Sequence, residues 1–480
     1  MSKNSVNKNP ALARRTFMKA ASAFAGSTMF GGVSFKAFAQ QAQALAPADH
    51  CFVFAYFSGG WDQLLNLDPR DPTEFTPERI SETRILPGYS LLSQDPSYPT
   101  MPIRPAGSNI AFGPAVGNFA NHFDVMSVVR GINMNTVAHE VGFRYFLTGK
   151  EPNGSAARNS STATEVVGQM YPKMANKPPV PNLAFNIESY NDRYGGYANA
   201  LRVSSANDLL LTLSPSPTAL DSEIEKQLLD MRGQPVTCEA QLYDSRGLVT
   251  QYQDARKQVR TVLDATLDRY FRFDSTTGDP MQVAMEKSAT VARYKLRVGS
   301  NGLPNDPRNS SAARAALVAT ALKKGVSQCV SMNIAGGLDT HFGTQLTQAN
   351  NQRAGWNALA DLISDLKESD HPSGGKFIDH TTIVVFSEFS RTPLINASGG
   401  RDHHITNSCA IIGKGVKHNH VFGASGNVGM AAGVANHDTG LLDPKGYQYL
   451  PDHVIATVMA GAGLDYSIMR VEPLKGLLAG

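Results

Sequence analysis

Carboxylate and imidazole side chains gather at points where apolar runs of this sequence end. Asp62 follows one such run, and Asp339 and His341 follow another. The four polar segments of this kind are Gly59-Gly60-Trp61-Asp62, Gly336-Gly337-Leu338-Asp339-Thr340-His341, Ser387-Glu388-Phe389-Ser390-Arg391-Thr392-Pro393 and Gly399-Gly400-Arg401-Asp402-His403-His404. Carboxylate oxygens and imidazole nitrogens are the ligands that zinc, manganese and similar divalent ions use. The pattern therefore predicts a metal site.

The apolar runs that precede these segments are typical of strands buried on both faces. Helical patterns alternate with them, which predicts an α/β fold with a mostly parallel sheet covered on both sides. Ligands of such sheets bind at the carboxyl ends of the strands. We therefore expect Asp62, Asp339, Glu388 and His403 to share one cleft. The expected strands are 51–57, 125–129, 327–334, 381–386 and 409–412, and the expected helices are 138–147, 353–366 and 452–462.

Each of these polar residues also has a structural interpretation. Asp62 would cap a turn, and Asp339 and His341 would pair with each other in a loop. Arg391 would either pair with Glu388 or hold an anion beside the metal. His403 and His404 are adjacent, so in an extended segment at most one of them faces the ions. A purely structural role for the whole set would leave the protein without metal.

The middle of the chain has a different character. Residues 150–307 are polar, with sparse strand signals, and three segments have amphipathic helical patterns: Ser222–Met231, Tyr252–Tyr270 and Met281–Arg297. We interpret 150–307 as a mainly helical insertion or cap on an α/β domain that spans residues 40–480.

The first 39 residues have the features of an export signal. Arg14 and Arg15 precede Thr-Phe-Met-Lys, an order similar to twin-arginine signals, and a short, weakly apolar stretch follows. Ala37-Phe38-Ala39 fits a signal-peptidase site, so residues 1–39 are predicted to be removed. The mature chain lacks the roughly 20-residue apolar run of a membrane helix. We expect a soluble periplasmic protein that uses the twin-arginine export machinery, whose passengers often fold with a metal already inserted.

Composition excludes one class of partner. The net charge of +3 is small and partly belongs to the basic signal region, so nucleic-acid binding is not expected.

Cys51, Cys329 and Cys409 lie in or beside apolar strands, whereas Cys238 lies in a polar stretch. Their spacing matches no thiolate metal site, and we expect the three strand cysteines to be free thiols.

The four polar segments resemble the recurring motifs of an exported bacterial family, domain of unknown function 1501 (DUF1501), which is related to the alkaline phosphatase and sulfatase superfamily. The resemblance covers essentially the whole mature chain, and Ser-Glu388-Phe-Ser-Arg391-Thr-Pro is its most specific part. It implies a three-layer α/β/α sandwich that binds two divalent ions, with zinc, manganese or calcium as candidates. Matched by position, the implied metal ligands are Asp62, Asp339, His341, Glu388 and His403, with Asp402 assisting.

The resemblance also implies a nucleophile at the start of a helix, where the superfamily has Ser, Thr or a modified Cys. The matching segment here is Asn133-Met-Asn-Thr136-Val-Ala138-His139, in which Thr136 is the nearby hydroxyl and Ala138 replaces the Ser of many relatives. One interpretation is a metal-dependent hydrolase of phosphate or sulfate esters, with Thr136 as nucleophile and Arg391 holding the anion. The alternative is a weakly active or inactive protein that binds an anionic ester or a periplasmic partner.

Overall fold

The computed structural model describes residues 45–154, 156–213, 267–273, 281–297 and 310–479. Its centre is an eight-stranded sheet with the order β10-β2-β9-β6-β1-β5-β3-β4. The strands are β1 Cys51–Phe57, β2 Met126–Asn133, β3 Asn182–Phe185, β4 Leu201–Val203, β5 Cys329–Ala335, β6 Thr381–Ser387, β9 Thr406–Gly413 and β10 His420–Phe422.

One strand of this sheet runs against the others. β9 pairs antiparallel with both β2 and β6, whereas the remaining neighbours pair parallel. The residues that precede β9 therefore lie at the same edge as the residues that follow β1, β5 and β6. This edge carries all four polar segments.

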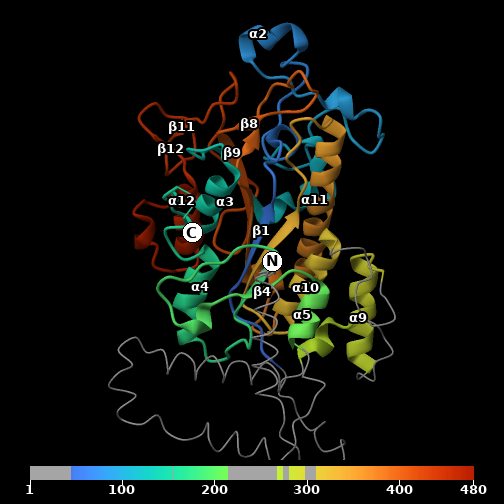
Figure 1. The fold of residues 1–480 in the computed structure, drawn as a ribbon, viewed down its shortest axis with the longest axis vertical. Helices are drawn as coiled ribbons and strands as arrows, with labels where there is room; N and C mark the ends of the chain where they lie inside the picture. The colour runs from blue at the N-terminus through green and yellow to red at the C-terminus, as the bar shows by residue number, and fades with distance from the viewer. Residues whose placement is uncertain (1–44, 155, 214–266, 274–280, 298–309, 480) are drawn as a thin grey trace, which may run out of the picture.

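Alternate residues of β1 face opposite sides of the sheet and belong to two separate cores. Val53 and Phe57 pack in one core with helices α10, Ser311–Lys323, and α11, Gln345–Glu368. Phe52 and Phe54 pack in the other with α3, His139–Thr148, α4, Thr162–Met170, and α12, Pro451–Gly461. Figure 1 shows these two helical layers on either side of the sheet. The predicted three-layer α/β/α sandwich is confirmed.

The five predicted strands and three predicted helices are all present; β1 has the predicted bounds, and the others have shifted ends. The largest shift is in α11, which begins at Gln345 rather than at residue 353. Thr344 caps it, because its hydroxyl accepts a hydrogen bond from the Thr347 amide.

The segment 150–307 was predicted to be a mainly helical insertion or cap, and its described part is joined to the main sheet. Its described part contains α4, α5, Ala206–Leu213, and α9, Met281–Arg293, but it also supplies β3 and β4 to the main sheet. These strands have only four and three residues, so their apolar runs are too short to stand out in the sequence. Ser222–Met231 and most of Tyr252–Tyr270 lie outside the described residues, as does Cys238.

The predicted signal peptide, residues 1–39, also lies outside the described residues. Among the helices that the structure describes, none has the length and apolar character needed to cross a membrane. The thiols of Cys51, Cys329 and Cys409 are free and buried, as predicted.

Candidate metal centre

A double-glycine turn after β1 brings three strand exits into contact. Gly59 and Gly60 both have positive φ, +111° and +75°, which only glycine adopts readily. A Cβ on Gly59 would lie 2.7 Å from the backbone nitrogen of Asp339. The Gly59 amide donates a hydrogen bond of 2.8 Å to Oε1 of Glu388. The turn therefore joins the segments that follow β1, β5 and β6.

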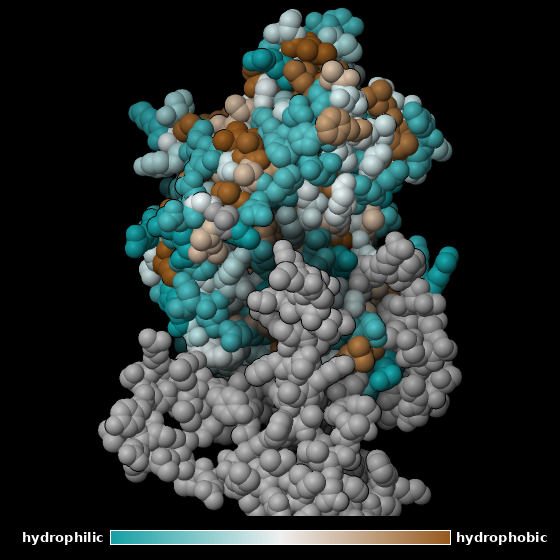
Figure 2. All heavy atoms as spheres, viewed as in Figure 1, coloured by the Kyte–Doolittle hydropathy of each residue, from teal (hydrophilic) through white to brown (hydrophobic). Residues whose placement is uncertain are grey.

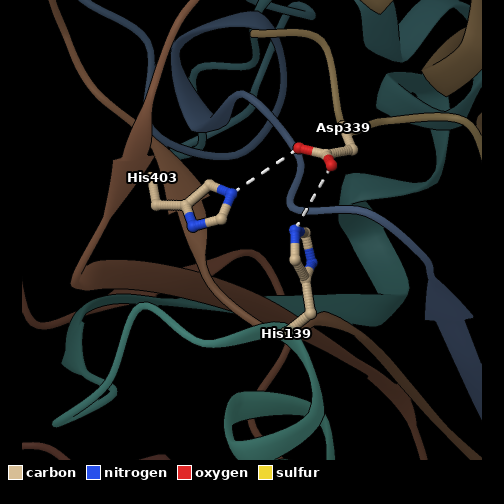
Figure 3. Close-up of side chains that lie close together, drawn as sticks. All are labelled: His139, Asp339 and His403. Atoms are coloured by element: carbon tan, nitrogen blue, oxygen red, sulfur yellow. Dashed lines mark ion pairs between the residues drawn. The ribbon is translucent and has the colours of Figure 1, made fainter.

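Asp339 is the centre of a cluster of imidazoles. Its Oδ2 lies 3.6 Å from Nε2 of His139, and its Oδ1 lies 3.2 Å from Nε2 of His341 and 3.5 Å from Nε2 of His403. His139, Asp339 and His403 each offer one ligand atom within 4.8 Å of the others. Figure 3 shows these three side chains converging from three separate segments of the chain. Two imidazoles and one carboxylate with room for further ligands are typical of catalytic metal sites.

The second nitrogen of each imidazole is bound to an oxygen. Nδ1 of His139 lies 2.8 Å from Oε1 of Glu388, and Nδ1 of His341 lies 2.8 Å from Oδ1 of Asp402. Nδ1 of His403 lies 2.7 Å from the carbonyl oxygen of Val137. A carbonyl or an ionised carboxylate can only accept, so each Nδ1 carries a proton.

When the rings are neutral, this arrangement leaves an Nε2 lone pair on each of the three histidines directed at the Asp339 carboxylate. Nε2 of His341 and Nε2 of His403 are only 2.8 Å apart. Lone pairs and a carboxylate in such proximity repel one another unless a proton or a metal ion lies between them. The donor set therefore fits a divalent cation, and each ligating ring would have the oxygen partner on its other nitrogen that is usual at metal sites.

The ionisation of the carboxylates suits the same role. Burial would raise the pKa of Asp339, but the hydrogen bond and charge of Arg391 outweigh it and lower that pKa. Hydrogen bonds from His341 and Asn396 lower the pKa of Asp402. Among the rings, the hydrogen bond to Glu388 raises the pKa of His139, whereas burial lowers the pKa of His403.

Glu388 lies behind His139, with both of its oxygens already bonded. Oε1 accepts from His139 and from the Gly59 amide, and Oε2 accepts from the Ser387 hydroxyl at 2.8 Å. The side chain is buried, and Gly142 of α3 packs directly on the Glu388 backbone, where a Cβ would meet the carbonyl oxygen at 2.2 Å. The structure places Glu388 as the partner that orients His139 rather than among the converging ligand atoms.

Arg391 is buried, and its guanidinium is taken up by the protein. It donates to the carbonyl oxygens of Gly59, Gly60 and Arg401 and to Oδ1 of Asp339, the last at 2.7 Å. These bonds fix the double-glycine turn and the orientation of Asp339. The geometry differs from the expected anion clamp, since the guanidinium is directed at the protein.

Two further predicted residues, Asp62 and Thr136, have other partners. Asp62 is fully buried and forms an ion pair with Arg401, at 2.9 Å from Oδ2, while Oδ1 caps the following turn at Leu64. Asp62 therefore caps a turn, as expected from the structural interpretation of this residue. The hydroxyl of Thr136 accepts a hydrogen bond from the Ala138 amide at 3.1 Å, three residues before α3 begins.

His139 is the site residue that sequence reasoning did not assign. It is the first residue of α3, in the position where the family resemblance implies a nucleophile, and that position was the available signal. His404 faces away from the cluster, with Nε2 3.0 Å from the carbonyl oxygen of Gly429. Only His403 of the adjacent pair therefore faces Asp339.

Comparison with solved structures finds alkaline phosphatase from the Antarctic bacterium TAB5 and two mutants of that enzyme with Mg bound in the M3 site. Each is 11% identical to this chain, covers 88% of it and 99% of its own chain, and has a TM-score of 0.31. No curated protein matches the chain. The family model described as "Protein of unknown function (DUF1501)" matches residues 50–440. Because that match spans most of the sequence, the chain belongs to the DUF1501 family.

Proposed function

We propose that this protein is a metal-dependent hydrolase whose divalent ion is held by His139, Asp339 and His403. The observation that carries the proposal is the convergence of imidazole Nε2 atoms on one carboxylate while every Nδ1 is bonded to an acceptor. When bound there, a divalent ion supplies a Lewis acid and lowers the pKa of water. Three protein ligands leave coordination positions open for a substrate oxygen and for water.

The pair formed by His341 and Asp402 supplies proton transfer in this proposal. Asp402 accepts from Nδ1 of His341, so the neutral ring presents the Nε2 lone pair toward the centre. Asn396 donates to the same Asp402 oxygen at 3.0 Å and to the carbonyl oxygen of His341, also at 3.0 Å. These bonds fix the ring. A fixed, neutral imidazole beside the reacting group is the usual general base of hydrolases.

The substrate class, phosphate or sulfate esters, rests on the resemblance of the sequence motifs. Metal binding without turnover is the second candidate. It is favoured by the engaged guanidinium of Arg391 and by the position of Thr136 outside the helix start, which leave neither the expected anion clamp nor the expected nucleophile.

Turnover by metal-replete protein on a panel of phosphate and sulfate mono- and diesters tests the proposal. Asp339→Asn is expected to lower both bound metal and turnover, whereas His341→Gln keeps the metal and lowers turnover by about 10²–10⁴-fold, as loss of a general base does. His418→Gln is the control, because His418 lies at the opposite edge of the sheet, after β9, bonded to the Gly413 carbonyl. Full metal occupancy with no turnover on any ester would favour the binding protein, and metal loss in His341→Gln would make His341 a ligand.

We also propose export to the periplasm by the twin-arginine route. Arg14-Arg15 and Ala37-Phe38-Ala39 support this. Replacing both arginines by lysine should leave the uncleaved protein in the cytoplasmic fraction. Processing at the wild-type rate would contradict it.

A further inference from the structure

Large apolar side chains are exposed around the metal centre. Phe342 is 87% exposed, Val137 45% and Ile405 41%. Each lies within two residues of a site histidine, since Val137 precedes His139, Phe342 follows His341 and Ile405 follows His403. We call Val137, Phe342 and Ile405 the apolar rim. Figure 2 shows that apolar surface lies among hydrophilic surface in the upper part of the molecule.

Hydrogen bonds of the site itself hold the rim in place. The Val137 carbonyl accepts from Nδ1 of His403, and the Ile405 carbonyl accepts from the Met134 amide at 2.9 Å, so the segments of Val137 and Ile405 lie side by side. The Phe342 ring lies 6.2 Å from the His341 ring, and the backbone carbonyl oxygen of His341 accepts a hydrogen bond from Asn396. The backbone that carries the rim is therefore tied to the segments of the metal ligands.

Exposure of Phe, Val and Ile side chains to water is unfavourable, and covering them with one another or with a ligand lowers the free energy. A stable protein interface takes about 20–30 residues a side, far more than this rim. A small-molecule site instead combines a few apolar side chains with a small number of polar groups that fix the reacting atoms. The size of the rim and its continuity with the metal centre both indicate a small molecule.

We infer that the substrate carries an apolar group, an alkyl chain or aromatic ring, which lies against Phe342, Val137 and Ile405 while its ester group faces His139, Asp339 and His403. This inference rests on the proposed function and specifies its substrate class. Phe342 is the specificity-determining residue, because its ring is the most exposed of the three and has the largest surface to be covered. It makes no contact with the reacting atoms.

Binding of non-hydrolysable alkylphosphonates tests this without turnover. Zinc-loaded full-length protein is titrated calorimetrically with methyl-, propyl- and hexylphosphonate. A fully buried methylene strengthens binding about fourfold, so an open rim should give about twofold per methylene. Phe342→Ala should flatten this dependence and leave the affinity for methylphosphonate unchanged. Leu211→Ala is the matched control, because Leu211 is 68% exposed on α5, at the opposite end of the molecule in Figure 1.

The outcomes separate the two proposals. Equal affinities for the three phosphonates, an unaltered dependence in Phe342→Ala, or no binding of any of them would overturn the inference. Chain-length dependence without ester turnover would support the apolar subsite and count against hydrolysis. Turnover on esters with no dependence on chain length would support hydrolysis and refute the subsite.

Discussion

The role of Glu388 can be tested by Glu388→Gln, which changes the charge and one atom of a buried side chain. In the wild type the carboxylate accepts hydrogen bonds from His139 and from the Gly59 amide, and it shares the Ser387 hydroxyl proton with the carbonyl oxygen of Phe57. A glutamine carbonyl can still accept from His139 or Gly59, but its amino group cannot. The imidazole then loses a charged acceptor that fixes both its tautomer and its direction.

The expected magnitude follows from this bond. A hydrogen bond to a charged group contributes about 1.5–3 kcal/mol and a neutral one about 0.5–1.5 kcal/mol. The difference of about 1–1.5 kcal/mol corresponds to a roughly five- to tenfold weaker metal affinity. Loss of the negative charge near the cation adds to this, so the total should reach the 10–100-fold range typical of such orienting partners.

Competition with a chromophoric zinc chelator measures the metal affinity directly. Glu165→Gln is the matched control, because Glu165 is another buried glutamate that pairs with Arg193 and accepts from Tyr194 away from the cluster. It should leave zinc affinity unchanged. Equal zinc affinity in wild type and Glu388→Gln would refute the orienting role. An equal loss in both variants would show that the effect is general destabilisation.

Three further predictions concern stability. Gly142→Ala should lower the free energy of unfolding by about 1–3 kcal/mol through overpacking. It should also weaken zinc binding, because the new Cβ would push α3 and His139 away from Glu388. A urea unfolding midpoint equal to that of the wild type would contradict this. Asp68→Asn should cost about 3–5 kcal/mol at pH 7, because Arg70 and Arg130 lose their buried partner. Burial alone would raise the folded-state pKa of Asp68, but those arginines and Ser425 outweigh it and lower that pKa. The contribution of Asp68 to the free energy of unfolding is therefore complete above its unfolded pKa of about 3.9 and is lost as pH falls through the folded pKa. A stability difference between variant and wild type that persists unchanged at pH 2 would contradict this. Chelation should remove about 2.7 kcal/mol of stability relative to protein at a metal concentration about 100 times Kd, and an unchanged melting temperature would argue against a metal.

The sheet and its polar edge could be predicted from the sequence because β1, β5 and β6 are mostly apolar runs that are each followed by an acid, after a pair of glycines at β1 and β5 and directly at β6. Their buried strands dictate where Asp339 and Glu388 emerge. The short strands β3 and β4 could not be predicted, because strands of four and three residues with only three and two apolar side chains resemble a loop. Their place in the sheet depends on pairing with β5 and with each other.

The residue types of the site were visible in the sequence, but not which oxygen faces which partner. Asp62, Asp339 and Glu388 all follow strands, and only the packed structure separates them. Arg401 neutralises Asp62, while Gly59 and His139 engage Glu388. His139 could not be predicted in the same way, because it begins helix α3, whereas His341 and His403 follow an aspartate closely in the sequence. The partner of each of these side chains depends on how side chains from elements distant in the chain are oriented toward one another.

The reversed direction of β9 also has a consequence for the folding of the chain. His139, Asp339 and His403 come from three distant segments, and His403 reaches the others only because β9 runs against its neighbours. An unfolded chain would have to close long loops to bring these three side chains together, at a large entropic cost. An ion held as proposed would therefore be captured only after the sheet has assembled, and it would then cross-link three distant segments of the chain. The compartment in which the protein folds would then decide which metal it receives.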